Sequence, residues 1–147
     1  SEKVMEKIGL IADEISPRIS EICDEVEKIS KNRYKIGYCY LYRGAAADKS
    51  QYCQSWLSER KISVPDRLQE TLRNCDVLLT VCSETTDTCF LPLMTGKDTF
   101  VLLPDDCRSI SVSRLSEIAA GYGTNVCFGE LAQSSIPEKI TGFFNHE

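Results

Sequence analysis

Hydrophobic residues recur along this chain with two different periods, and these periods predict where helices and strands lie. From Val4 to Ile29, apolar positions are spaced by three and four, which is the period of a helix with one buried face. Ser16 and Pro17 interrupt the series and are typical of a helix start. We therefore predict two leading helices, or one kinked helix, within residues 1–31. A competing interpretation makes Lys7 to Ala12 a first strand, because short apolar runs fit either structure.

After residue 31, short apolar runs alternate with helical patterns. The runs predict strands at residues 34–42, 62–64, 77–81, 99–103 and 125–128. The intervening patterns predict helices at residues 45–60, 65–72 and 113–120, a short helical stretch before Gly96, and a terminal helix from Pro137. This alternation is typical of a parallel sheet covered on both faces. We predict a single α/β domain over residues 1–147, a three-layer sandwich with a sheet of about five strands.

The strand at residues 34–42 carries an alternating series of tyrosines. Successive side chains on a strand point to opposite faces, so the alternation predicts that all four rings share one face. We interpret them as packing under a helix or as part of a subunit interface. The residues are Tyr34, Tyr38, Tyr40 and Tyr42.

Polar residues gather where the predicted strands end. Right-handed crossovers place the carboxyl ends of parallel strands at one edge of the sheet, where such folds bind ligands. The residues expected there are Arg43, Gly44, Ser83 to Thr88, Asp105, Asp106 and Glu130.

Composition and charge exclude several classes of function. Hydrophobic residues make up 42% and charged residues 27% of the 147 positions, which are ordinary globular values. A net charge of −5 argues against nucleic-acid binding, which needs a basic face. No apolar run approaches the roughly 20 residues that span a bilayer, and no leader pattern opens the chain. We expect a cytoplasmic protein that contacts neither membrane nor nucleic acid.

The eight cysteines and the one histidine limit metal and redox chemistry. No two cysteines are spaced as CxxC, so we expect no metal site and no thioredoxin-type pair. Several cysteines lie inside apolar runs, and the favoured interpretation is reduced, buried thiols. The alternative is a reactive thiolate at Cys82 or Cys89, which flank the hydroxyl-rich loop. The only histidine, His146, lies next to the C-terminus, which argues against histidine-dependent catalysis.

The segment DVLLTVCSETTDT (76–88) resembles the phosphate loop of the sugar isomerase (SIS) domain family. That loop follows a hydrophobic strand and reads Ser-x-Ser-Gly-Glu-Thr. Ser83, Thr85, Asp87 and Thr88 match it, whereas Thr86 replaces the glycine. MTGKDTFVLLPDD (94–106) and SVSRLSEIA (111–119) are similar to the elements that follow in this family. The turn after the first family strand usually reads Gly-x-Gly-x-Ser, but residues 41–46 here contain one glycine and no serine.

The resemblance implies a phosphosugar-binding domain that acts as an aldose–ketose isomerase or as a sensor, and we expect a homodimer. The missing glycines favour the sensor, and we expect no cofactor. Implied ligand-binding residues are Arg43, Gly44, Ser83, Thr85, Thr86, Thr88 and Asp105, with Glu130 as the candidate catalytic base. Helix capping and polar turns are the structural alternatives for these side chains. Two other functions stay open: a nucleotide- or nucleoside-binding or -processing Rossmann-like domain, and a non-catalytic interaction module.

Overall fold

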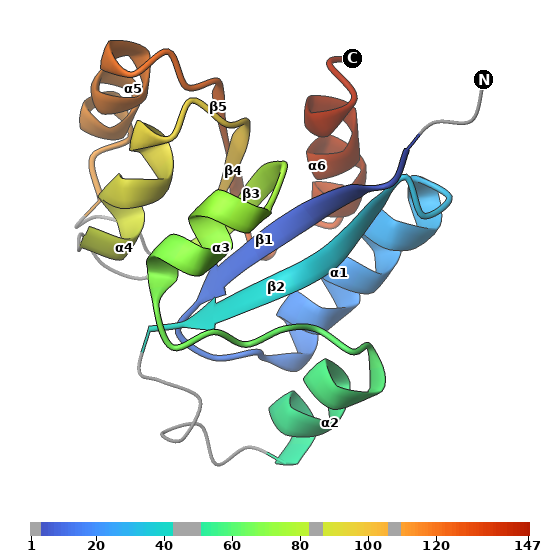
Figure 1. Cartoon of the computed structure of the whole chain (residues 1–147). Helices are drawn as coiled ribbons and strands as arrows, with labels where there is room; N and C mark the ends of the chain where they lie inside the picture. The colour runs from blue at the N-terminus through green and yellow to red at the C-terminus, as the bar shows by residue number, and fades with distance from the viewer. Residues whose placement is uncertain (1–3, 43–50, 83–86, 106–109) are drawn as a thin grey trace.

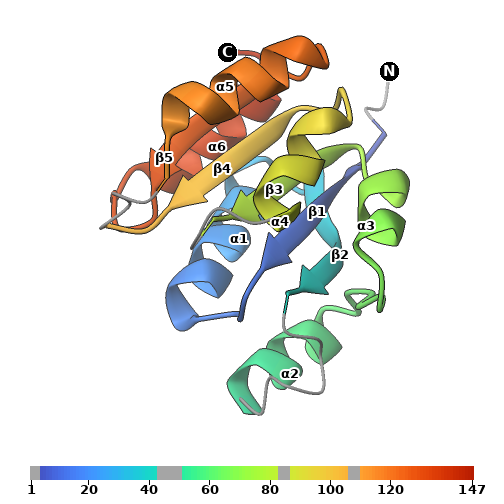
Figure 2. The ribbon, with the colours of Figure 1, turned by 90° about the vertical axis from the view of Figure 1, so that its left-hand side faces the viewer.

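The computed structural model shows a parallel sheet with helices on both faces (Figures 1 and 2). It describes residues 4–42, 51–82, 87–105 and 110–147, without the side chains of Asp87 and Thr88. The predicted α/β class is confirmed. The elements in chain order are β1 (Glu6–Ala12), α1 (Pro17–Ile29), β2 (Tyr34–Leu41), α2 (Gln51–Glu59), α3 (Leu68–Asn74), β3 (Val77–Val81), α4 (Asp87–Phe90), the 3-10 helix η1 (Leu91–Met94), β4 (Thr99–Leu103), α5 (Val112–Gly121), β5 (Val126–Glu130) and α6 (Ile136–Phe144).

The strand order identifies the fold as Rossmann-like. The sheet runs β2-β1-β3-β4-β5, and every pair is parallel. A further segment lies outside β2, because Ser63 forms a parallel bridge with Tyr38 and exchanges backbone hydrogen bonds with Gly37 and Cys39. Counting this bridge as the third strand gives the order 3-2-1-4-5-6, which is the doubly wound arrangement. The sequence prediction of a short strand at residues 62–64 therefore finds its place at the sheet edge.

The prediction of helix throughout the leading segment is wrong for residues 6–12, which form β1. Ile8, Leu10 and Ala12 belong to the core on one face of the sheet, and Gly9 faces α3 on the other. A strand buried on both faces reads as a continuous apolar run. The apolar run of β1 also continues the three-and-four spacing of α1. Periodicity therefore could not distinguish the strand from the helix that follows it.

The predicted helix start at Ser16 is confirmed. Ser16 is the N-cap of α1, and its hydroxyl accepts a hydrogen bond from the backbone N–H of Ile19 at 3.2 Å. Pro17 follows at the first turn, where its missing N–H carries no penalty. The helix predicted from residue 65 begins later than expected, at Leu68.

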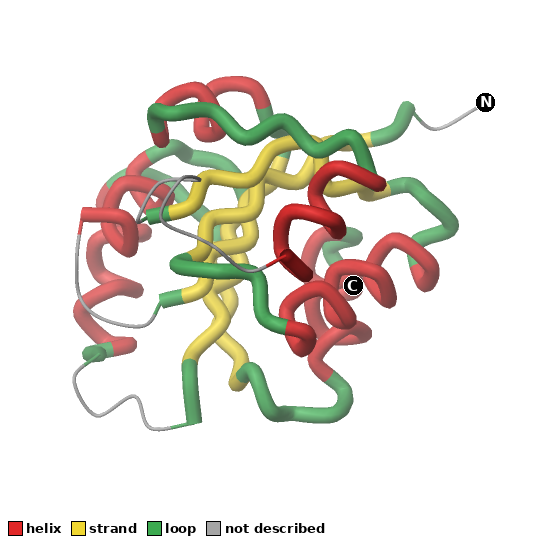
Figure 3. The backbone as a smooth tube through the Cα atoms, turned by 90° about the horizontal axis from the view of Figure 1, so that it is seen from below, coloured by secondary structure: helices red, strands yellow, loops and turns green. Residues whose placement is uncertain are grey.

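Two cores lie on opposite faces of the sheet, and Figure 3 shows helices on either side of the strands. The larger core joins the sheet to α1, α2 and α6. The smaller core joins it to α4, η1 and α5, with Val101, Leu103 and Leu115 among its buried members. Strand β4 contributes to both, since Phe100 and Leu102 alternate with Val101 and Leu103.

The prediction that four tyrosines share a face of β2 is wrong for Tyr34. The register between β1 and β2 shifts after Ile8, so that Ile8 pairs with Ile36 but Gly9 pairs with Tyr38. This irregularity reverses the alternation. Tyr34 is buried in the larger core, and its hydroxyl donates to the carbonyl oxygen of Phe144 at 2.7 Å. Tyr38 and Tyr40 point to the opposite face.

Candidate functional site

The carboxyl ends of β1 and β3 lie side by side at the point where the strand order of the sheet reverses. From β1 the chain proceeds outward to β2, and it then returns to β3 on the other side of β1. Loops on either side of such a switch point diverge and leave a crevice, where open α/β sheets bind ligands. The fold therefore places a candidate site at this edge.

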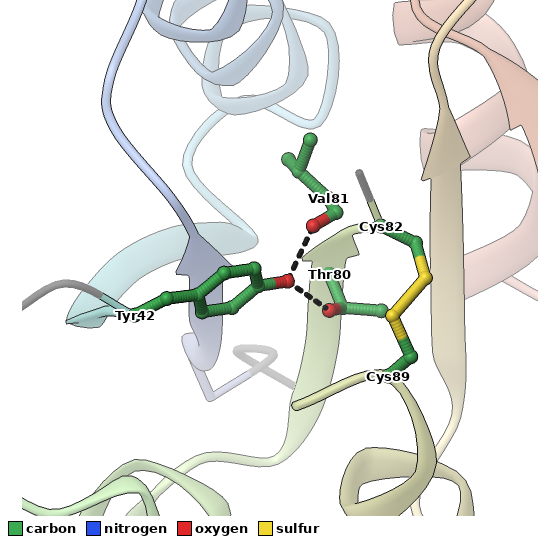
Figure 4. Close-up of a disulfide and its surroundings, with 5 residues drawn as sticks. All are labelled: Tyr42, Thr80, Val81, Cys82 and Cys89. Atoms are coloured by element: carbon green, nitrogen blue, oxygen red, sulfur yellow. Dashed lines mark hydrogen bonds between the residues drawn. A yellow bond between two sulfur atoms is a disulfide. The ribbon is translucent and has the colours of Figure 1, made fainter. Parts of the chain in front are cut away.

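Tyr42, directly after β2, ties these strand ends together. Its backbone N–H donates to the carbonyl oxygen of Ala12 at 2.9 Å. Its hydroxyl donates to the carbonyl oxygen of Val81 and lies 3.5 Å from the hydroxyl of Thr80. Figure 4 shows the ring reaching from β2 to the end of β3. Sequence reasoning treated Tyr42 as packing, because nothing in the alternation signals a bond to a strand two positions away in the sheet.

Arg18, in the first turn of α1, connects this helix to the chain after β5. Its Nε donates to the carbonyl oxygen of Leu131 at 3.0 Å, and one Nη donates to that of Gln133 at 2.9 Å. The other Nη pairs with Glu21 at 2.9 Å. These bonds use three of the five N–H donors of a guanidinium. Sequence reasoning missed Arg18, which the spacing of α1 presents only as a polar position.

Two neighbouring cavities lie at the carboxyl ends of β4 and β5; they share Ala132, and the smaller one is also lined by Arg18. The smaller, of about 380 Å³, is lined by Arg18, Pro104, Asp105, Leu131 and Ala132. The larger, of about 550 Å³, is lined by Leu103, Phe128, Gly129, Glu130, Ala132, Gln133 and Lys139. Together they offer carboxylates and cations, as a polar ligand requires.

A third cavity, of about 300 Å³, lies between α2 and the end of β2. Its described lining is apolar apart from Gln54 and Ser58: Leu41, Cys53, Leu57, Ile62 and Val64. It offers no charged group for a phosphate among these residues.

Only part of the predicted site falls within the described residues. Asp105 and Glu130 are exposed, and each lines one of the two neighbouring cavities; their role as ligands stays a prediction. Thr88 lies in α4, but its side chain is not described. The remaining predicted ligands lie outside the described residues: Arg43, Gly44, Ser83, Thr85 and Thr86.

The prediction of reduced, buried thiols holds for four cysteines and is wrong for two. Cys82 and Cys89 form a disulfide (Figure 4). Cys23, Cys39, Cys53 and Cys75 are buried thiols, and Cys127 is a partly exposed thiol. Cys107 lies outside the described residues. The sequence separation of seven residues does not indicate a disulfide. Only the return of α4 toward β3 brings the two sulfurs together.

Glu27 is a buried carboxylate that lies away from this edge. It accepts hydrogen bonds from the backbone N–H of Ile36 at 3.3 Å and from Arg60 at 2.9 Å. Arg60 also pairs with Asp24 at 2.6 Å and stacks on the Trp56 ring. Burial raises the pKa of Glu27, against the lowering effects of the Ile36 N–H and Arg60. These contacts fasten α2 to α1, so the perturbed pKa reflects structure rather than a ligand site.

Replacing Glu27 by glutamine tests this assignment through the pH dependence of stability. A carboxyl whose folded pKa is raised holds its proton more firmly in the native state, so its contribution to stability falls as pH rises above the ordinary glutamate pKa of 4.5. We expect the stability of Glu27→Gln to increase relative to that of the wild type as pH rises from about 4 to about 7. Urea denaturation at a series of pH values measures the difference. Glu21→Gln, an exposed change on the same helix, is the control, and a pH-independent difference for Glu27→Gln contradicts the assignment.

Among the residues described, no group of three or more histidine, cysteine or acidic side chains is arranged to hold a metal ion. In the same part of the chain, no helix combines the length and the apolar character needed to cross a membrane.

Comparison with known proteins shows the fold and leaves the family open. No family model matches the chain, and no curated protein matches it. Solved structures do match. Homoserine dehydrogenase from S. aureus has a TM-score of 0.61 at 13% identity, over 86% of this chain and 33% of that protein.

Two further structures show the same relation. GenD2 from gentamicin A biosynthesis, solved in complex with NAD, has a TM-score of 0.62 at 11% identity, over 88% of this chain and 36% of its own. UDP-N-acetylglucosamine 3-dehydrogenase from Acidithiobacillus ferrooxidans has a TM-score of 0.61 at 9% identity, over 86% and 38%. The chain thus spans about a third of each of these proteins. The first and third are dehydrogenases by name, and the likeness shows that the fold is shared, whereas the SIS resemblance stays a prediction.

The β1–α1 turn does not fit the dinucleotide that such folds hold. The pyrophosphate normally lies against a glycine-rich turn and the free N–H groups of the following helix. Here no glycine occurs between Gly9 and Gly37. Pro17 has no N–H, the Ser16 hydroxyl occupies the N–H of Ile19, and the turn carries the acidic residues Asp13 and Glu14. The fold is Rossmann-like, but its β1–α1 turn does not fit a pyrophosphate.

Proposed function

We propose that the carboxyl edge of this Rossmann-like domain binds a nucleoside or mononucleotide. The observation that carries the proposal is the 3-2-1-4-5-6 arrangement, with its switch point between β1 and β3. The similarity to two dehydrogenases and to GenD2, which was solved with NAD, supports a nucleotide over other small molecules. We expect the ligand to carry no pyrophosphate, because the β1–α1 turn does not fit one.

The two neighbouring cavities supply groups of the required kind. Asp105 and Glu130 carry carboxylates that accept hydrogen bonds from ribose hydroxyls. The two guanidinium donors of Arg18 beyond its three bonds suit a single phosphate. The carboxylates and the guanidinium line two neighbouring cavities of about 380 Å³ and 550 Å³. We expect these cavities to hold one mononucleotide.

A sugar phosphate is the second candidate ligand, favoured by the resemblance of residues 76–88 to the SIS phosphate loop. The same carboxylates would accept its hydroxyl donors. An isomerase would also need a base in a dry pocket, whereas Glu130 is exposed. We therefore favour binding without isomerisation for this ligand. The expected homodimer stays a prediction.

Thermal denaturation with a panel of ligands tests the proposal. The panel contains adenosine, AMP, NAD, glucose 6-phosphate and inorganic phosphate. A ligand at 100 times its dissociation constant adds about 2.7 kcal/mol of stability. We expect adenosine or AMP to stabilise the wild type and the shift to shrink in Asp105→Asn. Glu117→Gln, an exposed change on α5, is the matched control and keeps the full shift.

The remaining outcomes separate the candidates. Stabilisation by glucose 6-phosphate without any effect of AMP or adenosine supports the second ligand. The absence of a shift with adenosine, AMP and NAD contradicts the nucleotide proposal.

A further inference from the structure

The disulfide between Cys82 and Cys89 joins the end of β3 to a helix of one turn. The two Cα atoms are 5.8 Å apart, and the cysteines are 0% and 1% exposed. Figure 4 shows the bond beside Thr80 and Val81, at the strand end to which Tyr42 is attached. The link therefore lies at the edge of the sheet where the ligand site is placed.

The two ends of this link are anchored unequally. The backbone N–H of Cys82 donates to the carbonyl oxygen of Leu102 at 2.9 Å, so its position is set by the sheet. Cys89 lies in α4, which has four residues and continues into the four-residue η1. A single turn of helix has no stability of its own. α4 and η1 also pack through Phe90 and Leu93 in the smaller core. Breaking the disulfide removes their covalent link to β3 and should therefore loosen α4 and leave β3 in place.

The buried thiols are poorly placed to exchange with this pair. Cys23, Cys39, Cys53 and Cys75 are buried. Burial raises the pKa of Cys23 well above its usual value and that of Cys75 to about 11. Because the thiolate is the form that attacks a disulfide, Cys23 and Cys75 should exchange slowly. The partly exposed Cys127 is instead removed in a control variant.

We propose that Cys82 and Cys89 are a reversible redox modification site, whose co-reactant is a low-molecular-weight thiol such as glutathione. The loop that the bond closes spans eight residues, and short loops gain the least entropic stabilisation from cross-linking. The fold should therefore survive the loss of this bond, so that the exchange can be reversible. This proposal is independent of the nucleotide proposal, because it concerns the protein without ligand.

The chemistry is a pair of exchange steps. A thiolate of the co-reactant attacks one sulfur, forms a mixed disulfide and displaces the other cysteine as a thiolate. A second co-reactant thiolate then attacks the mixed disulfide and displaces the remaining cysteine. The protein gains two electrons and two protons, and the co-reactant leaves as its disulfide. Because both sulfurs are buried, the first attack follows a local opening of α4.

The first test equilibrates the folded protein in glutathione buffers of differing ratio. The samples are quenched with acid and alkylated, and the label is mapped to the peptides carrying Cys82 and Cys89. We expect the oxidised fraction to pass from nearly complete to nearly absent over a change of about 100-fold in the ratio of oxidised to reduced glutathione. The Cys127→Ser variant controls for exchange through the exposed thiol. A pair that stays fully oxidised, or fully reduced, at every ratio overturns the proposal.

The second test measures hydrogen exchange in the oxidised and reduced protein. We expect residues 87–94 to exchange at least about 10-fold faster after reduction, while β4 (Thr99–Leu103) is unchanged. The Cys82→Ser/Cys89→Ser variant should resemble the reduced protein in any buffer, and this keeps the test valid if reductant has other effects. Equal exchange of residues 87–94 in the oxidised and reduced states overturns the proposed loosening of α4.

Discussion

Gly129→Val should destabilise the protein by about 1–3 kcal/mol, the usual cost of overpacking a closed core. Gly129 lies in β5, where a Cβ atom would stand 2.4 Å from Cδ1 of Ile136 and 2.9 Å from Cζ of Phe100. Ile136 and Phe100 are both fully buried, so neither has open space to move into. A lower midpoint of urea denaturation, with an unchanged slope, is the expected observation.

Gly142→Ala is the matched control for this prediction. Gly142 lies in α6, and the nearest atom to its added Cβ is a carboxylate oxygen of Glu147 at 3.9 Å. Alanine favours a helix over glycine by about 0.5–1 kcal/mol, so this change should stabilise the protein. A wild-type midpoint for Gly129→Val would show that α6 is not packed tightly against β5.

Lys97→Met should destabilise the protein by about 1.5–3 kcal/mol, in the range of hydrogen bonds to charged groups. The ammonium of Lys97 donates to three backbone carbonyl oxygens at the end of α3: those of Leu72, Arg73 at 3.2 Å and Cys75 at 2.7 Å. These groups lack helical partners, and a cation also favours the negative end of the helix dipole. Methionine keeps the length of the side chain and removes its donors.

Lys139→Met separates this effect from the loss of a positive charge. The Lys139 ammonium donates to one carbonyl oxygen, that of Phe128 at 2.8 Å, at an exposed position. We expect it to change stability by less than about 1 kcal/mol. Equal effects of the two substitutions, measured by urea denaturation, would contradict the capping role of Lys97.

The α/β class and most strands could be predicted from the sequence because buried parallel strands are apolar runs. β3 and β4 were placed at their observed residues for that reason. β1 was misread because Ile8 and Ile11 also fit the helical spacing of the segment that follows. Only its partners, β2 and β3 on either side, determine that it is a strand.

The candidate site was harder to predict, because it depends on contacts between distant segments. Asp105 and Glu130 could be placed at this edge because both follow apolar runs, and strand ends converge in a parallel sheet. Tyr42 and Arg18 were missed, since their partners Val81 and Leu131 are far away along the chain. The register shift that turns Tyr34 away from Tyr38 likewise has no signal in the alternation of residues.

We propose that this Rossmann-like domain, whose β1–α1 turn does not fit a pyrophosphate, binds a nucleoside or mononucleotide. Isothermal titration calorimetry with AMP and with NAD, on the same protein in the same buffer, tests it most directly. We predict that AMP binds more tightly than NAD, because the β1–α1 turn with Pro17 and no glycine offers no place for a pyrophosphate. Tighter binding of NAD than of AMP would contradict the claim.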